Sequence, residues 1–148
     1  MTPITIISGA QTGVDRAALD AAIACGLDYG GSIPRGRRAE DGPVSQHYAA
    51  LIEMNSGGYA VRTRRNVRDA DATLILCAGP PEGGTALTES IALRLKRPVL
   101  VLDIDCETRR SAIKKMRAGN ERLSFSQSSI FLLGSLPSTH PVDTPLEV

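Results

Sequence analysis

Short apolar runs alternate along the chain with segments of helical pattern. Strands are predicted at 4–7, 72–77 and 98–103. These runs are apolar without interruption, which is typical of parallel strands that are covered on both faces of a sheet. Residues 28–33 are a weaker strand candidate because Gly30 and Gly31 interrupt them, and 130–133 could form one more strand.

Segments between these runs have helical character. Helices are predicted at 14–25, 86–96 and 107–118. Gly26 and Gly119 follow two of them at positions that favour a helix end. In the second helix Leu87, Ile91 and Leu95 recur at helical spacing and predict its apolar face.

Two further segments are less regular. The basic stretch 59–70 predicts a short helix that begins near Thr63 or Asn66. Residues 44–52 predict a helix or a turn, and 34–43 predict an ordered loop with Pro and Gly punctuation.

The alternation of strands and helices predicts an α/β fold with a doubly wound, mostly parallel sheet between helices. The chain has 148 residues, which favours a single domain over 1–148. Residues 134–148 are rich in Pro, Ser and Thr and are expected to be a tail.

Composition narrows the function classes. The net charge of +1 gives no reason to expect nucleic-acid binding, and aromatic residues at 3% argue against a base-stacking surface. The three cysteines are widely spaced, which fits reduced thiols and neither a disulfide framework nor a zinc site. No apolar stretch approaches the ~20 residues of a membrane span. We therefore expect a cytoplasmic protein without membrane association.

Three loops are expected at the carboxyl edge of the sheet, namely 9–13, 34–43 and 79–85. The first and third are rich in glycine and each opens a helix, so their backbone N–H groups would face a common crevice. Such an arrangement predicts a two-sided clamp for an anion, usually a phosphate. The alternative is a pair of β–α turns that bind nothing.

The segment 34–68 supplies positive charge. Its cations are Arg35, Arg37, Arg38, Arg62, Arg64, Arg65 and Arg68. Against three carboxylates they give this segment a net charge of +4. Guanidinium forks suit bidentate contacts with phosphate, and we expect two or three of the seven in the site and the rest at the surface or a subunit interface.

The acidic candidates have several possible roles. Glu40 and Asp41 could orient arginines, accept N–H groups of a bound heterocycle, or cap the loop. Glu89 could be a general acid or base, although a carboxylate on a helix surface is the commoner case.

Other kinds of site find little support. His47 and His140 are far apart in sequence, so no metal site is expected. Cys77 is interpreted as a small core residue. The motifs of serine hydrolases and of the G-x-x-x-x-G-K-[ST] phosphate loop are absent.

The chain resembles the molybdenum cofactor carrier family, whose Rossmann-like members lie within a superfamily of nucleotide-binding and cytokinin-activating, lysine-decarboxylase-like proteins. The resemblance covers about 4–105, and its most specific part is the G-R-x-A-E-D-G loop at 36–42. The other matching stretches are 9–19, 59–67, 69–76 and 79–88. Ala10 stands where the family usually has a second glycine, and the family's C-terminal strand, Gly-Pro-Arg loop and helix are not recognisable after Gly119.

The resemblance implies a homo-oligomeric binding protein, more than an enzyme, for a small anionic ligand. Its ligand would be molybdenum cofactor, with no nicotinamide or flavin, no nucleic acid and no membrane partner. The expected binding residues are Gly9, Gln11, Thr12, Gly13, Arg16, Arg35, Gly36, Arg37, Glu40, Asp41, Gly83, Gly84, Thr85 and Thr88.

Two alternatives remain open. Related enzymes release ribose 5-phosphate from nucleoside monophosphates with a P-G-G-x-G-T-x-x-E loop. The stretch 82–89 lacks the proline and one glycine of that loop, and Glu89 would be the catalytic residue. The other alternative is a domain that senses a nucleotide and signals to a partner.

Overall fold

The computed structural model describes residues 3–106, 108–121 and 128–135. The strands are β1 (Ile4–Ile7), β2 (Asp28–Ile33), β3 (Leu51–Glu53), β4 (Ala72–Cys77), β5 (Val99–Asp103) and β6 (Ser128–Ser135). The helices are α1 (Val14–Ala24), the 3₁₀ turn η1 (Arg35–Arg37), α2 (Tyr59–Asp69), α3 (Gly83–Arg94) and α4 (Arg109–Glu121).

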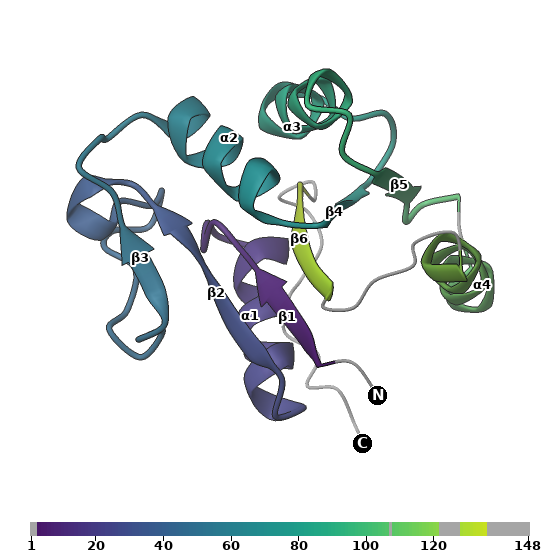
Figure 1. Ribbon diagram of the computed structural model, residues 1–148, viewed down its shortest axis with the longest axis horizontal. Helices are drawn as coiled ribbons and strands as arrows, with labels where there is room; N and C mark the ends of the chain where they lie inside the picture. Colours follow the sequence, from purple (N-terminus) through teal and green to yellow (C-terminus); the bar gives the residue numbers. More distant parts are fainter. Residues whose placement is uncertain (1–2, 107, 122–127, 136–148) are drawn as a thin grey trace.

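The strands form one sheet in the order β3-β2-β1-β6-β4-β5, and every pairing is parallel. Figure 1 shows β6, the last strand in sequence, between β1 and β4. β6 and β4 approach each other closely at Gly134. A Cβ on this residue would lie 2.0 Å from the Leu76 carbonyl oxygen. A side chain at this position would push two central strands apart.

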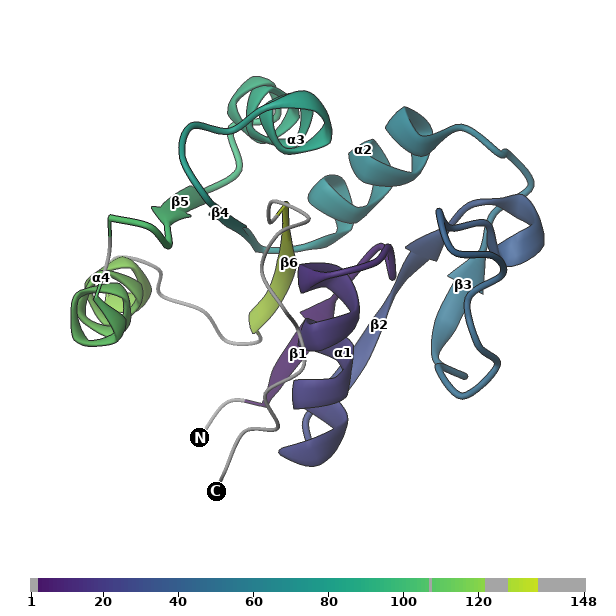
Figure 2. The same ribbon diagram turned by 180° about the vertical axis from the view of Figure 1, so that it is seen from behind.

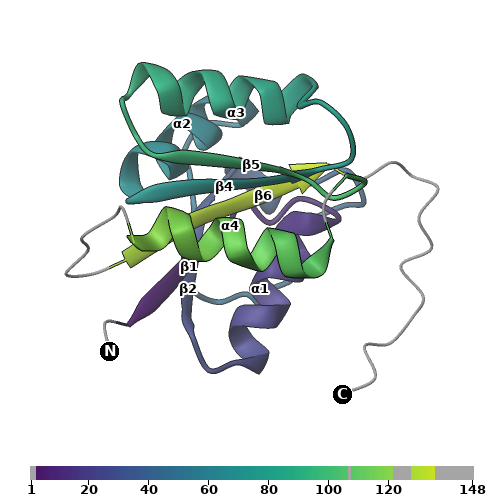
Figure 3. The same cartoon turned by 90° about the vertical axis from the view of Figure 1, so that its right-hand side faces the viewer.

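The helices cover both faces of the sheet. Figure 3 shows α2 and α3 on one side of the strands and α1 and α4 on the other. Seen from behind, α1 lies in front of β1 and β2 (Figure 2). The connection from β1 leads toward one end of the strand order and that from β4 toward the other, so right-handed crossovers place α1 and α3 on opposite faces. Both helices nevertheless begin at the carboxyl edge of the sheet.

The expected α/β fold with a doubly wound parallel sheet is confirmed. The strands Asp28–Ile33 and Ala72–Cys77 have the predicted bounds, and α1 ends one residue before the predicted Cys25. The predicted strand at 130–133 is the middle of β6. Gly134 and Ser135, expected in the tail, belong to this strand, and 136–148 lie outside the described residues.

Several boundaries differ from the predictions. Helix α2 begins at Tyr59, before Thr63 and Asn66, because Gly58 is its N-cap and accepts the Arg62 amide at 3.2 Å. Helix α3 begins three residues earlier than predicted, at Gly83, and α4 passes through Gly119 to Glu121. In the segment 44–52, residues 44–50 form turns, and Leu51 and Ile52 belong to β3. β3 has three residues, which are too few to leave a periodic pattern in the sequence. Its pairing with β2 is what makes it a strand.

Apolar side chains fill two clusters. One joins β4, β6, α2 and α3 and includes Ile75, Ile91 and Phe131. The other includes Ala10, Leu19 and Ile33. Among the described residues no helix has the length and apolar character needed to cross a membrane.

Candidate functional site

The turn between β1 and α1 is closed by its own polar groups. The Ser8 hydroxyl donates to the Asp15 carbonyl oxygen at 2.9 Å and accepts the Ala10 amide at 3.1 Å. The Gln11 amide donates to the Asp15 carboxylate at 3.3 Å. Ala10 has a φ of 56°, in the left-handed region that favours glycine.

These contacts leave donors at the start of α1. The backbone N–H groups of Thr12, Gly13 and Val14 have no protein acceptor within the described residues. These groups and the positive end of the helix dipole are the donors that the turn sequence predicts for an anion.

Helix α2 brings Arg62 to this turn, although the two are distant in sequence. The arginine is only 8% exposed, and its guanidinium lies against Gly9, where a Cβ would be 1.5 Å from Nη1. Gly9 is therefore the residue that makes room for the buried guanidinium.

The guanidinium of Arg62 is poorly satisfied. Its Nη1 is 3.7 Å from the Asp15 carboxylate, which is an ion pair beyond hydrogen-bond distance. Its Nε has no hydrogen-bond partner among the described residues. The Tyr59 ring centroid is 5.9 Å from the guanidinium carbon. A buried cation with an unfilled donor is costly unless an acceptor comes from outside the chain.

Asn66, one turn along α2, fixes the position of Arg62. Its side-chain oxygen accepts the Ser32 amide at 2.7 Å, and its side-chain nitrogen donates to the Ser32 carbonyl at 3.0 Å. Asn66 is 1% exposed, so this pair of bonds anchors α2 at the carboxyl end of β2.

Burial shifts the pKa values of Asp15 and Arg62, the ion pair at this turn. It raises the pKa of Asp15 to about 6, although the positive charge of Arg62 and the Gln11 amide act in the opposite direction. Burial also lowers the pKa of Arg62, against the attraction of Asp15. The turn thus contains a carboxyl group that titrates near neutral pH beside a cation.

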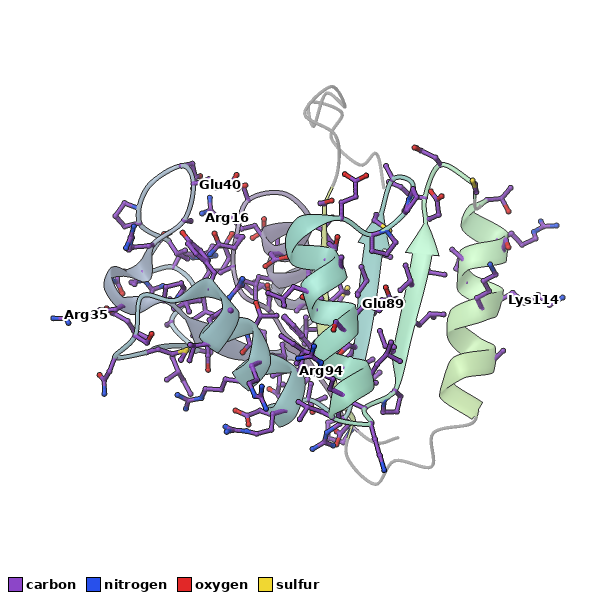
Figure 4. The ribbon with its side chains drawn as sticks, turned by 90° about the horizontal axis from the view of Figure 1, so that it is seen from above. Arg16, Arg35, Glu40, Glu89, Arg94 and Lys114 are labelled. Atoms are coloured by element: carbon purple, nitrogen blue, oxygen red, sulfur yellow. The ribbon has the colours of Figure 1, made fainter. Side chains whose placement is uncertain are left out.

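The loop between β2 and β3, residues 34–50, contacts the start of α1. We call this loop the arm. Thr12 donates its hydroxyl to the Glu40 carboxylate at 3.2 Å, and the Gln11 side chain donates to the Arg38 carbonyl at 3.2 Å. Arg16 forms a two-pronged ion pair with Asp41, which holds the pKa of Asp41 below its usual range. Figure 4 labels Glu40 and Arg16 at this end of the molecule.

The three residues of η1 do not join this cluster. The Arg37 guanidinium is buried and donates to the carbonyls of Val44 at 2.8 Å, Ser45 at 2.7 Å and Tyr48 at 3.3 Å. The Gly36 amide donates to Glu53 at 2.5 Å. Arg35 points away from the start of α1 (Figure 4). Arg37 is therefore committed to holding the arm together.

The threonine hydroxyls of the turn between β4 and α3 form hydrogen bonds within the turn. The Thr85 hydroxyl accepts the Glu82 amide at 3.0 Å and donates to the Glu82 carbonyl at 2.6 Å. The Thr88 hydroxyl donates to the Gly84 carbonyl at 2.8 Å. The amides of Gly83 and Gly84 have no acceptor within the described part of the chain.

Two acidic residues lie near this second turn. Asp103 accepts the Gly79 amide at 2.9 Å. Glu89 projects from the side of α3 (Figure 4). Burial, with the negative charges of Asp103 and Glu89, raises the pKa of the buried Cys77 thiol. Arg94 and Lys114 lie on α3 and α4 away from the first turn (Figure 4).

Apart from Arg35, Gly36 and Arg37 of η1, the predicted binding residues are separated by the sheet into two groups. Gly9, Gln11, Thr12, Gly13, Arg16, Glu40 and Asp41 gather at the start of α1. Gly83, Gly84, Thr85 and Thr88 belong to α3, which is on the opposite face and beyond β6. Both helix starts share the carboxyl edge, with the end of β6 between them.

Sequence reasoning did not single out Arg62 or Asp15. Arg62 stood among seven arginines, and nothing local separates it from Arg64 or Arg65. The available signal was the spacing of Arg62 and Asn66, one helical turn apart, on a face that is buried and mostly polar. Among the described residues no group of His, Cys, Asp and Glu side chains has the arrangement of a metal site.

Comparisons with known proteins agree with this architecture. The chain is 39% identical to a protein from Syntrophus aciditrophicus SB, whose crystal structure is named "Putative molybdenum carrier protein". The match covers 91% of this chain and 84% of that chain, with a TM-score of 0.82. No curated protein matches.

A family model matches most of the chain and ends before β6. Residues 6–123 match the family described as "Circularly permutated YpsA SLOG family". If β6 preceded β1 in the chain, the sheet would start in its middle and extend to both sides in the ordinary doubly wound order. The chain belongs to the circularly permutated YpsA SLOG family.

Proposed function

We propose that this protein binds a small anionic ligand at the start of α1 and acts as a carrier for it. The observation that supports this most directly is the buried guanidinium of Arg62, whose Nε lacks an acceptor among the described residues. An anion beside Gly9 would lie against the Nη1 side of this guanidinium, and it would also receive the N–H groups of Thr12 and Gly13.

Molybdenum cofactor is the ligand that we infer as cargo. It carries a phosphate and oxygen atoms on molybdenum, which are acceptors suited to amides and guanidinium groups. The donors at the start of α1 fit such a ligand. The name of the Syntrophus protein and the 39% identity support the same assignment.

The second glycine turn would serve the far end of a long ligand. β1 and β4 are separated by β6, which corresponds to about 10 Å at ordinary strand spacing. A ligand that spans this distance would reach the amides of Gly83 and Gly84. The hydroxyls of Thr85 and Thr88 are engaged within α3, so we expect backbone donors to make this contact.

The test compares Arg62→Gln with Arg64→Gln, an exposed arginine on the same helix. Inorganic phosphate, molybdate and purified molybdenum cofactor are titrated into each protein by calorimetry, and oxidation of the cofactor is followed in parallel. We expect wild type and Arg64→Gln to bind saturably and to protect the cofactor. Arg62→Gln should bind about 100-fold more weakly, the loss of about two charge-assisted hydrogen bonds.

Thermal melting separates loss of binding from loss of folding. A folded Arg62→Gln protein should melt cooperatively but gain no stability from ligand, whereas wild type gains it by mass action. Equal affinity of Arg62→Gln and wild type, or no binding by wild type, would overturn the proposal.

A further inference from the structure

Glu40 is an exposed carboxylate at the anion-binding end of α1. Within the described residues its donor is the Thr12 hydroxyl, at 3.2 Å from one carboxylate oxygen. The neighbouring Asp41 differs, because Arg16 neutralises it with two N–H groups. Glu40 therefore brings negative charge to a turn whose other features attract anions.

The nearby cations do not compensate this charge. Arg16 is paired with Asp41, and the Arg37 guanidinium is occupied by three backbone carbonyls. Arg62 lies against Gly9 and 3.7 Å from the Asp15 carboxylate, and it forms no ion pair with Glu40 among the described residues. A simple anion bound at the turn would be repelled by Glu40. A ligand that carries N–H donors beside its phosphate would turn that repulsion into hydrogen bonds.

The arm holds Glu40 in place for such a contact. Its tip is attached to the turn through Arg38 and Asp41, and the Tyr48 hydroxyl near its end donates to Asp20 of α1 at 2.7 Å. Glu40 is thus fixed by contacts on both sides, and its second carboxylate oxygen accepts no hydrogen bond from the described chain.

We propose that Glu40 is the specificity-determining residue of this site and selects phosphate esters of a planar heterocycle with two adjacent N–H donors. This inference rests on the proposed function. A carboxylate accepts two parallel N–H groups in one plane. A ring N–H next to an exocyclic amino group, as in guanine-type and pterin-type rings, presents that pair.

Nucleoside monophosphates test the number of donors. Guanosine 5′-monophosphate has the ring N–H and the amino group, inosine 5′-monophosphate has the ring N–H, and adenosine 5′-monophosphate lacks both at the corresponding edge. We expect wild type to bind them in that order of affinity. The first should exceed the third by about tenfold or more, because hydrogen bonds to a charged acceptor are involved.

Glu40→Gln is the variant that tests the residue. It should reduce affinity for guanosine 5′-monophosphate about tenfold, to the level of the adenosine compound. Affinity for inorganic phosphate should stay the same or rise, because the repulsion is removed. Asp28→Asn, an exposed carboxylate at the start of β2, is the matched control and should keep the wild-type order.

Each failure has a distinct signature. If phosphate binds in an Arg62-dependent way but the three nucleotides bind equally, or if Glu40→Gln keeps the preference, this inference is wrong and the proposed function stands. Equal binding of O-phosphoethanolamine and guanosine 5′-monophosphate would also overturn the assignment to a planar ring. If wild type binds neither phosphate nor any nucleotide, the proposed function fails first.

Discussion

The two glycine turns of this protein look alike in sequence and differ in structure. Each follows a parallel strand, opens a helix and lies at the carboxyl edge of the sheet. The β1–α1 turn receives a buried arginine from α2 and carboxylates from the arm. The β4–α3 turn satisfies its polar side chains within itself, through Thr85 and Thr88.

This difference shows where charge can act on a ligand. Helix N-termini supply amide donors at both turns, but only a side chain from another element adds a full positive charge. At the first turn Gly9 leaves the space for that side chain.

The largest expected effect concerns the buried carboxyl group of the first turn. Burial raises the pKa of Asp15 from 3.8 to about 6, so the folded protein holds this proton more tightly than the unfolded chain. The resulting stabilisation is present below about pH 4 and is lost as the pH rises to about 6. Relative to wild type, Asp15→Asn should gain about 3 kcal/mol in free energy of unfolding between pH 4 and pH 7.

Urea unfolding of both proteins at several pH values measures this change. Glu82→Gln, an exposed carboxylate at the second turn, is the control and should not reproduce it. A difference between Asp15→Asn and wild type that stays constant with pH would show that Asp15 does not titrate as a buried group.

The second prediction compares one glycine from each turn. A Cβ on Gly9 would lie 1.5 Å from Arg62 Nη1, whereas a Cβ on Gly84 would meet nothing within 4 Å. Gly9→Ala should lower the free energy of unfolding by about 2 kcal/mol, as overpacking of a core does. It should also weaken phosphate binding, because the guanidinium must move.

Gly84→Ala should be nearly neutral for stability, within about 0.5 kcal/mol. Chemical denaturation and phosphate titration of the two variants provide the comparison. Equal effects at the two positions would mean that the first turn does not depend on Arg62.

The smallest effect is expected at the cap of α3. Thr85→Val keeps the side-chain shape but removes the hydroxyl that bonds to the backbone of Glu82. It should cost about 1 kcal/mol of stability, the usual value of an N-terminal cap. Phosphate affinity should remain within about twofold of wild type, since this hydroxyl is not expected to contact ligand.

Thr12→Val is the counterpart at the first turn, where the hydroxyl contacts Glu40. Melting curves and phosphate titrations of the two variants compare what each threonine hydroxyl contributes to stability and to phosphate affinity. A tenfold loss of phosphate affinity in Thr85→Val would place the second turn in direct contact with the anion and would end the proposed asymmetry.

Local sequence was sufficient for much of the fold. The apolar run Ala72–Cys77 and the segment after Gly13 formed the predicted strand and helix, because burial on both faces and helix propensity act over a few residues. The resemblance to the carrier family also followed from short motifs and their order, and it is confirmed by the family match together with the 39% identity to the Syntrophus protein.

The composition of the site needed contacts that are distant in sequence. Asn66 anchors α2 on Ser32, which is 34 residues earlier, and this contact places Arg62 below Gly9. Nothing near Arg62 in the sequence distinguishes it from the exposed Arg64. Burial of a charged side chain is a property of the surrounding structure, so the chain alone could not identify it.

What the sequence determined by itself is the alternation of strands and helices and the two glycine turns, since both arise from short-range propensities. What only the tertiary structure decided is that β6 lies between β1 and β4, and that one turn received a buried arginine while the other closed on its own threonines. The physical reason is that strand order and the pairing of buried charges depend on which distant segments pack together.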